Sequence, residues 1–92
     1  MTYKIVVKQG VHKELERLPE KVQDKIFEKI SELSSEPRPF GITKLKEFNL
    51  ANQPFKDYYR IRVGNYRIIY AIQDVIITIT VVKVAHRKEV YG

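Results

Sequence analysis

The sequence predicts a single α+β domain: an N-terminal strand, a helical hairpin, then a three-stranded antiparallel meander that completes one sheet packed on the helices. Three observations predict it. Residues 3–8 are rich in β-branched side chains, which favour a strand. Residues 11–33 carry apolar side chains at helical spacing, interrupted at Pro19. From residue 58 onward apolar and polar residues alternate, as they do in half-buried strands.

The helical region divides into two helices at Pro19. Val11, Leu15 and Leu18 recur at helical spacing and predict a short first helix. It ends before Pro19, because the residue preceding a proline avoids helical geometry. Pro19 itself suits the first turn of a second helix, which should stop by Pro37. The apolar stripe of the second helix consists of Val22, Ile26, Phe27, Ile30 and Leu33.

Residues 34–54 are less regular, because prolines, a glycine and asparagines interrupt them. Within this region Lys44, Leu45 and Lys46 are expected to form either a short strand or the edge of a loop.

The last third of the chain is expected to form three strands joined by two tight turns. The strands should span residues 58–63, 66–72 and 75–84. Gly64-Asn65 makes a two-residue hairpin turn, for which both residue types are favoured. Gln73-Asp74 is expected to make the second turn.

With two-residue turns, Arg62 pairs with Arg67 across the first hairpin, and Ile72 pairs with Val75 across the second. Directly opposed side chains share a face, so one face is apolar throughout and must receive the helices. That face holds Tyr59, Ile61, Val63, Tyr66, Ile68, Tyr70, Ile72, Val75, Ile77, Ile79 and Val81. The opposite face holds Arg60, Arg62, Arg67, Ile69, Ala71, Thr78 and Thr80.

The arginines on the second face are the most informative feature of the pattern. Arg62 lies directly across from Arg67, and like charges in that position are destabilising. A fold tolerates such a cluster more readily where an anion binds, and phosphate is the obvious candidate. The alternative is a solvated sheet face, on which screened arginines cost little.

Composition sets the remaining bounds. The 92 residues make one domain, residues 1–92, with no room for a second core. The net charge of +6 is uneven: residues 1–43 contribute +1 and residues 44–92 contribute +5. A basic face of this kind suits a nucleic acid or an acidic protein partner.

Several classes of protein are excluded by composition. There is no cysteine, so disulfides and thiolate metal sites are ruled out, and two histidines far apart in sequence do not suggest a metal site. No apolar run approaches the ~18 residues of a membrane span, and the N-terminus does not resemble a secretion signal. We therefore expect a cytoplasmic protein without a metal, a cofactor or a membrane partner.

Four motifs connect the chain to a known family. They are K-L at 44–45, Y-R-I-R at 59–62, G-N-Y-R-I-I-Y at 64–70 and H-R-K-E-V-Y at 86–91. With them, the chain resembles the toxins of the RelE family, within the RelE/ParE superfamily, over almost its whole length. The Y-R-I-I-Y strand is shared with ParE-type relatives, whereas the terminal H-R-x-x-V-Y is more particular to the RelE side. The resemblance implies a RelE-like, microbial ribonuclease-like fold.

The resemblance also implies a function. RelE toxins are metal-independent endoribonucleases that cut messenger RNA in the ribosomal A site and so inhibit translation. Each is encoded with an antitoxin that wraps and silences it. The implied partners are a cognate antitoxin, acidic and DNA-binding, together with the ribosome and messenger RNA. Operator DNA would be bound only through the antitoxin complex, and no cofactor is implied.

The resemblance assigns a set of site residues. The basic pair of the family falls on Arg60 and Arg62, the next strand's arginine on Arg67, the last-strand arginine on Arg87 and the C-terminal tyrosine on Tyr91. Arg62, Arg67, Arg87 and Tyr91 form the expected catalytic group, and Arg60 and Arg62 are expected to hold RNA phosphate. Two lysines, Lys44 and Lys46, are further expected phosphate contacts.

One departure from the family concerns the general base. Well-known members carry lysines where this chain has Arg60 and Arg62, and an arginine, with a pKa above ~12, cannot give up its proton. These arginines could still clamp phosphate. Tyr91 or His86 is then the better candidate base, and His86 has the more suitable ordinary pKa, ~6.5.

Two other functions stay open at this stage. One is a ParE-like toxin that blocks DNA gyrase by binding, without nuclease chemistry. The other is a degenerate member that keeps only antitoxin and operator binding, which the change to Arg60 and Arg62 keeps open. The presence of Arg87 and Tyr91 in H-R-K-E-V-Y favours the nuclease, because a pure binder has no evident need for them.

Overall fold

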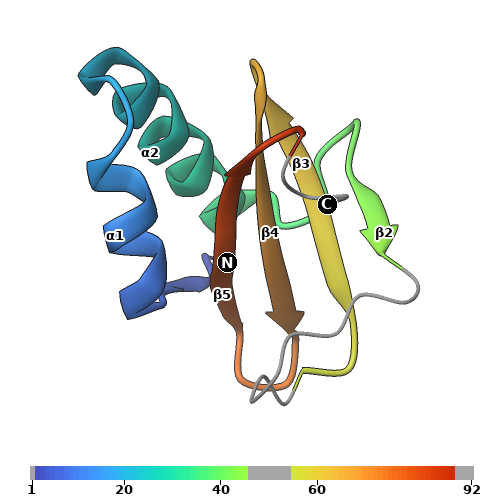
Figure 1. The fold of residues 1–92 in the computed structure, drawn as a ribbon. Helices are drawn as coiled ribbons and strands as arrows, with labels where there is room; N and C mark the ends of the chain where they lie inside the picture. The colour runs from blue at the N-terminus through green and yellow to red at the C-terminus, as the bar shows by residue number, and fades with distance from the viewer. Residues whose placement is uncertain (1, 46–54, 89–92) are drawn as a thin grey trace.

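A computed structural model describes residues 2–45 and 55–88 as two layers, with a helical hairpin on one face of a five-stranded sheet (Figure 1). The elements are β1 (Lys4–Val7), α1 (Gln9–Glu16), α2 (Glu20–Ser35), β2 (Thr43–Leu45), β3 (Tyr58–Val63), β4 (Tyr66–Gln73) and β5 (Thr78–His86). This arrangement confirms the predicted α+β class and the order of its elements. Neither of the helices in the described ranges is long and apolar enough to cross a membrane.

The strands lie in the order β1-β5-β4-β3-β2. The last three strands are antiparallel neighbours, as predicted, and β2 pairs antiparallel with β3, so residues 43–45 form a strand and not a loop edge. β1 pairs with β5 in parallel, which makes the sheet mixed. Because β1 occupies the edge beside β5, the N-terminal strand closes the side of the sheet that the meander leaves open (Figure 1).

The main core lies between the helices and the sheet. The helices contribute Val11, Leu15, Ile26, Ile30 and Leu33. The sheet contributes Ile61, Ile68, Tyr70, Ile79, Val81 and Val84. Burying one such side chain stabilises a fold by roughly 1.5–3 kcal/mol, so this layer dominates the stability. Phe27, predicted in the helical stripe, is instead 43% exposed, because Ile26 and Ile30 already occupy the face that α2 turns to the sheet.

The predicted turn at Gln73-Asp74 is wrong. Gln73 is the last residue of β4 and pairs with Thr78, so the connection is four residues long, residues 74–77. The N–H of Ile77 donates to the carbonyl of Asp74 (3.1 Å), and Ile77 has a positive φ of 49°. Glycine or asparagine normally occupies such a left-handed position, so an isoleucine there conceals the loop from sequence analysis.

The longer loop changes the residues that meet across β4 and β5. Ile72 pairs with Ile79 and not with Val75, which is 98% exposed in the loop. The predicted core positions of Ile79 and Val81 are nevertheless confirmed, since both are fully buried. The pairing moved by an even number of residues, and an even shift leaves each side chain on its original face.

A β-bulge makes a second change in the same pair of strands. Ile69 pairs with Lys83 and Tyr70 pairs with Val81, so Val82 has no residue opposite it. A bulge of this kind bends the strand and raises its local twist. β5 then continues to residue 86, two residues beyond the predicted end.

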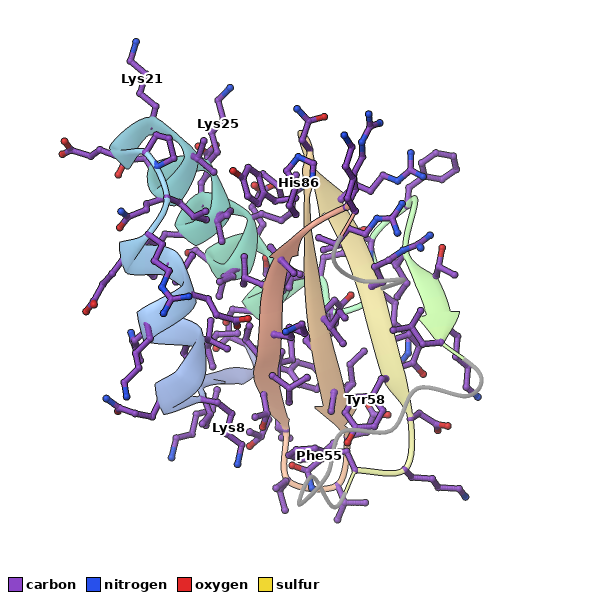
Figure 2. The ribbon with its side chains drawn as sticks, in the orientation of Figure 1. Lys8, Lys21, Lys25, Phe55, Tyr58 and His86 are labelled. Carbon is purple, nitrogen blue, oxygen red and sulfur yellow. The ribbon has the colours of Figure 1, made fainter. Side chains whose placement is uncertain are left out.

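The face away from the helices is also partly apolar. A second cluster of buried side chains lies there, formed by Tyr58, Ile69, Ala71 and Val82 with Leu45 and Phe55 packed against it. The Phe55 ring meets the edge of Tyr58 at 6.0 Å, and the Lys8 ammonium lies 5.9 Å from the Phe55 centroid (Figure 2). The arginines of this face therefore adjoin an apolar patch that includes Ile69 and Ala71, both of which were predicted on this face.

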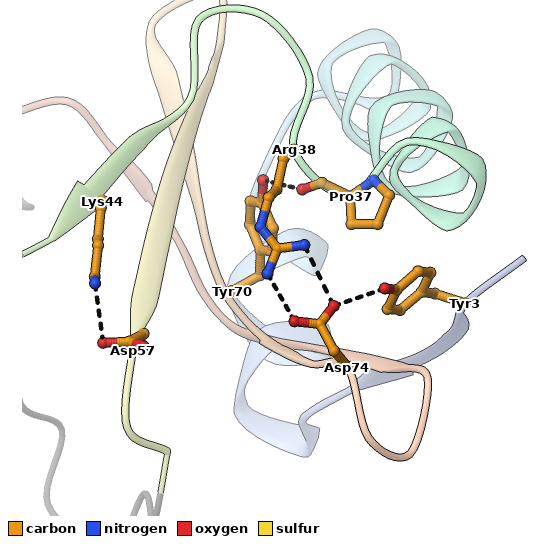
Figure 3. Close-up of polar contacts among 7 residues, drawn as sticks. All are labelled: Tyr3, Pro37, Arg38, Lys44, Asp57, Tyr70 and Asp74. Atoms are coloured by element: carbon orange, nitrogen blue, oxygen red, sulfur yellow. Dashed lines mark hydrogen bonds and ion pairs between the residues drawn. The ribbon is translucent and has the colours of Figure 1, made fainter.

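A polar cluster links the segment before β1 and the segment after α2 to the β4–β5 loop (Figure 3). Arg38 donates to both carboxylate oxygens of Asp74, at 3.3 and 2.8 Å, and the Tyr3 hydroxyl donates to the same carboxylate at 2.6 Å. Beside it the buried Tyr70 hydroxyl donates to the Pro37 carbonyl at 2.9 Å. Burial raises the pKa of Tyr70, and the Arg38 and Tyr3 hydrogen bonds lower the pKa of Asp74.

The lowered pKa of Asp74 makes a prediction about acid stability. A carboxylate whose pKa is depressed in the folded state stabilises the fold above its ordinary pKa of ~3.9, and this contribution is lost as the pH falls through the folded value. We expect Asp74→Asn to shrink the loss of urea stability between pH 7 and pH 3. Tyr3→Phe is the partial control, because it removes one hydrogen bond and leaves the Arg38 pair. If Asp74→Asn lost as much stability between pH 7 and pH 3 as wild type, the effect would belong to other carboxylates.

Candidate functional site

The β3–β4 hairpin brings two arginines together at its closed end. Gly64 has a φ of 59° and starts the two-residue turn, which confirms the predicted register of Arg62 opposite Arg67. Arg67 is only 6% exposed, whereas Arg62 is exposed. A buried guanidinium beside an exposed one gives this part of the sheet a concentrated positive charge.

Arg60 lies on the same face of the sheet, beside the edge strand β2. It lies two residues before Arg62 on β3 and pairs with Thr43 of β2. Its guanidinium donates to the Thr43 hydroxyl at 3.3 Å, so the edge strand helps to hold this side chain. Arg60, Arg62 and Arg67, which we call the arginine face, thus come from two adjacent strands, as the sequence predicted.

Arg87 reaches the same end of the molecule from β5. Its backbone N–H donates to the carbonyl of Asn65, at 2.8 Å, in the turn that joins β3 to β4. Within the described ranges, no carboxylate forms an ion pair with Arg62 or Arg87. The structure therefore brings Arg87 close to the arginine face.

Two other predicted phosphate contacts do not join this group. Lys44 pairs with Tyr59, which packs against the main core, so its side chain belongs to the opposite face of the sheet from Arg62. Its ammonium also forms an ion pair with Asp57 at 3.4 Å (Figure 3). Lys46 and Tyr91 lie outside the described residues.

His86 lies on the helix side of the sheet. It is directly across from Tyr66, and the two rings meet edge to face at 5.4 Å. Its Nδ1 accepts the N–H of Lys88 at 3.2 Å, which leaves Nε2 to carry the proton of a neutral ring. The structure thus separates His86 from Arg62 and Arg67, and its predicted acid–base role is not supported by proximity to them.

An open cavity of about 380 Å³ lies beside His86, between α1 and β5. Its lining includes Glu14, Arg17, Leu18, Tyr66 and His86. The cavity therefore opens on the helix side, away from the arginine face.

Glu14 is a structural residue that sequence reasoning missed. One carboxylate oxygen accepts the backbone N–H of Val84 at 3.1 Å, and the other pairs with the Lys83 ammonium at 3.2 Å. β1 pairs with β5 only as far as Val81, so beyond that point Glu14 replaces a neighbouring strand. The signal was present, because position 14 falls within the apolar helical stripe, where a carboxylate needs a partner.

Comparisons with known proteins fit this geometry. A model of the ParE toxin family, the toxins of parDE type II toxin–antitoxin systems, matches residues 5–91. The chain belongs to this family. No curated protein sequence matches the chain.

Solved structures of RelE toxins are similar over nearly the whole domain. A chain of the archaeal RelE–RelB complex from Pyrococcus horikoshii OT3 is 29% identical, with 97% of this chain and 99% of that chain covered and a TM-score of 0.80. A chain of the RelBE2 complex from Mycobacterium tuberculosis is 25% identical, with 95% and 100% covered and a TM-score of 0.72. The isolated RelE toxin of E. coli is 26% identical, with 97% and 90% covered and a TM-score of 0.66. The predicted membership of the RelE/ParE superfamily is confirmed, and the protein is a toxin of a type II toxin–antitoxin system.

The role of Glu14 can be tested by stability. Glu14→Ala should lower the free energy of unfolding by about 1–2 kcal/mol, because the N–H of the buried Val84 loses its acceptor. Glu14→Gln keeps an acceptor oxygen and should cost less. Glu16→Ala, at an exposed position of the same helix, is the matched control. Urea unfolding gives the energies, and faster amide exchange at Val84 in Glu14→Ala alone would locate the change. Unaltered exchange there would contradict the assignment.

Proposed function

We propose that this toxin is a ribosome-dependent, metal-independent endoribonuclease that cuts messenger RNA and so inhibits translation in the cytoplasm. The observation that carries the proposal is the convergence of Arg62, Arg67 and Arg87 at one end of the sheet. Arginine is the side chain best suited to phosphate, because its planar fork donates two parallel hydrogen bonds and keeps its charge. The similarity to RelE structures supports the same reaction class.

The arginines would act on the charge that builds up during cleavage. The ribose 2′-oxygen attacks the phosphorus, the P–O5′ bond breaks, and a 2′,3′-cyclic phosphate and a 5′-hydroxyl result. A base takes the 2′-hydroxyl proton and an acid supplies one to the departing 5′-oxygen. Arg62, Arg67 and Arg87 would stabilise the negative charge on the phosphate oxygens, which is greatest in the transition state.

Burial makes Arg67 the strongest of these contacts. A guanidinium that is 6% exposed is screened less by water and salt than an exposed one, so its charge acts more strongly on a phosphate nearby. The exposed Arg62 can move to meet the substrate, and Arg60 is tied to Thr43 at the edge of the sheet. We assign Arg67 to transition-state charge and Arg60 to binding of a neighbouring phosphate.

The proton-transfer role falls to Tyr91 in this proposal. No arginine can act as a base, and His86 lies on the helix side of the sheet. The phenol of Tyr91 is the remaining group in the predicted set that can both donate and accept a proton. We propose that it positions or activates the 2′-hydroxyl.

A second candidate function is inhibition of DNA gyrase by binding alone. The family model that matches the chain is the model of the ParE toxins, and this match favours gyrase inhibition. A degenerate toxin that retains only antitoxin and operator binding is the third candidate. The three candidate functions differ in whether translation, DNA replication or neither stops first in the cell, and in whether messenger RNA is cut.

We further propose that a cognate antitoxin, acidic and DNA-binding, neutralises the toxin. The similar chains from P. horikoshii and M. tuberculosis were solved in complex with their antitoxins. The basic balance of residues 44–92, +5, suits an acidic segment. Operator DNA would be reached through that complex.

Expression of the toxin alone tests the choice among these functions. We expect incorporation of labelled amino acids to fall within minutes, before incorporation of thymidine, because translation is the proposed target. Messenger RNA should be cut only where ribosomes are loaded. If replication stops first and messenger RNA stays intact, gyrase is the target. Continued growth with normal antitoxin binding would identify a degenerate member.

Point variants test the division of labour in the site, by single-turnover cleavage of message on programmed ribosomes. Arg67→Ala and Arg87→Ala should each slow cleavage by about 10²–10³, the usual effect of losing one preorganised charge contact. Tyr91→Phe should slow it by about 10²–10⁴, and Arg62→Lys should be tolerated. Lys44→Ala removes the same charge on the other face of the sheet and should change the rate little.

These variants have two checks. Thermal unfolding and antitoxin affinity must stay near wild type, since Arg67 is buried and its loss could disturb the fold. His86→Gln is expected to retain most activity, because its ring faces away from the arginines. A loss in His86→Gln as large as that in Tyr91→Phe would move the base role to His86, and wild-type rates in both Arg87→Ala and Tyr91→Phe would refute the site.

A further inference from the structure

The most exposed large apolar side chain in the described ranges is Phe40, in the loop between α2 and β2. Its relative exposure is 103%, so the ring contributes nothing to the core. Among residues 2–45 and 55–88, the other exposed large apolar side chains are Phe27, Val75 and Ile76. A single exposed apolar residue needs no functional explanation by itself. What distinguishes Phe40 is the backbone that presents it and its place at the end of the sheet that carries the arginine face.

A tight turn holds Phe40 at its tip. The N–H of Ile42 is directed at the carbonyl of Pro39 at 3.4 Å, and Gly41 between them has a φ of 93°. Glycine with positive φ at the third position, after a residue with negative φ, defines a type II turn. Phe40 occupies the second position, where the side chain projects away from the turn. The chain therefore uses a glycine-dependent turn to present an aromatic ring to solvent.

The turn lies at the end of the sheet that carries the arginines. Thr43, two residues after Gly41, pairs with Arg60. Continuing this antiparallel register places Gly41 level with Arg62, and Phe40 one residue further toward the β3–β4 turn. Figure 1 shows the loop entering β2 and the β3–β4 turn at the same end of the molecule. Val75 and Ile76, by contrast, lie in the β4–β5 loop at the opposite end (Figure 1).

Single-stranded nucleic acid is bound by proteins that combine exposed aromatic rings with cations, and Phe40 and the arginine face lie at the same end of the sheet. Cations hold the phosphates, and aromatic rings stack on unpaired bases, which all have a π-face. We propose that Phe40 is a stacking platform for a base of the bound messenger RNA, flanking the phosphate held by Arg62 and Arg67. The inference rests on the proposed nuclease function and adds a specificity contact outside the predicted set of site residues.

Cleavage on programmed ribosomes over a range of toxin concentrations tests the platform. Phe40→Ala loses one base–aromatic stack. The ratio of its maximal rate to its half-saturating concentration should therefore fall by about five- to 100-fold. Phe40→Trp keeps a stacking ring and should restore activity. Val75→Ala removes an equally exposed apolar side chain at the other end of the sheet and should behave like wild type.

A fluorescence measurement reports stacking independently of cleavage. The chain contains no tryptophan, so Phe40→Trp introduces a single tryptophan at the turn, and its fluorescence can be excited selectively over that of the six tyrosines. A 2′-O-methylated RNA hexanucleotide, which cannot be cleaved through its 2′-oxygen, should quench this fluorescence in a saturable manner. The same probe should leave Val75→Trp unchanged.

The outcomes separate this inference from the proposed function. If wild type cleaves message and Phe40→Ala cleaves equally well, the platform is refuted while the nuclease stands. If wild type does not cleave, the nuclease proposal fails, and saturable quenching of Phe40→Trp alone would still show a base contact. A Phe40→Ala variant that cleaves normally but binds antitoxin more weakly would make Phe40 an antitoxin contact and overturn the inference.

Discussion

The register of the β3–β4 hairpin is the constraint on which the structure and the proposed site both depend. Side chains alternate between the two faces of a strand, so a slip of one residue would exchange them. The observed register buries Ile61, Ile68 and Tyr70 against the helices and places Arg62 opposite Arg67 on the other face. Burial of these three side chains contributes several kcal/mol, whereas a like-charge pair across strands costs roughly 0.2–1 kcal/mol. Burial wins, and the arginines are held together as its consequence.

Apolar side chains on the face away from the helices explain why Arg67 can be buried there. That face is not fully exposed to solvent, because Tyr58, Ile69 and Ala71 form a small apolar cluster there. Arg67 precedes Ile69 by two residues on the same face of β4, so its aliphatic stem can pack on apolar neighbours while its charge stays near the turn. A cation fixed in this way needs little reorganisation when a phosphate arrives, which is the property that lets such a group favour a transition state. In a relative with lysines at the positions of Arg60 and Arg62, those side chains could also exchange a proton. In the proposed nuclease, the arginines of this face would bind charge and would not exchange a proton.

The end of β5 is held by contacts of a different kind. β1 covers β5 only as far as Val81, and a bulge at Val82 redirects the strand. Glu14 then supplies the acceptor that a neighbouring strand would have supplied, and the Arg87 N–H bonds to the β3–β4 turn. These two contacts place the last part of the strand, and with it the position of Arg87 relative to the arginine face. A side chain of α1 thus helps to position the strand end that carries Arg87, a member of the proposed site.

The sequence by itself determined the two helices, the β3–β4 hairpin and the shared face of Arg60, Arg62 and Arg67, but left residues 44–46 open between a strand and a loop edge. The helical spacing of Val11 and Leu15, and the Gly64-Asn65 turn, depend on neighbours along the chain, so local patterns were sufficient to predict them. The tertiary structure decided the β4–β5 loop, where Ile77 takes a conformation usually reserved for glycine, and the bulge that follows it. It also decided which face His86 and Lys44 occupy, and that Glu14 would serve as a strand partner. Those outcomes depend on pairing between segments distant in sequence, whose energy of burial outweighs the local preferences that a pattern can record.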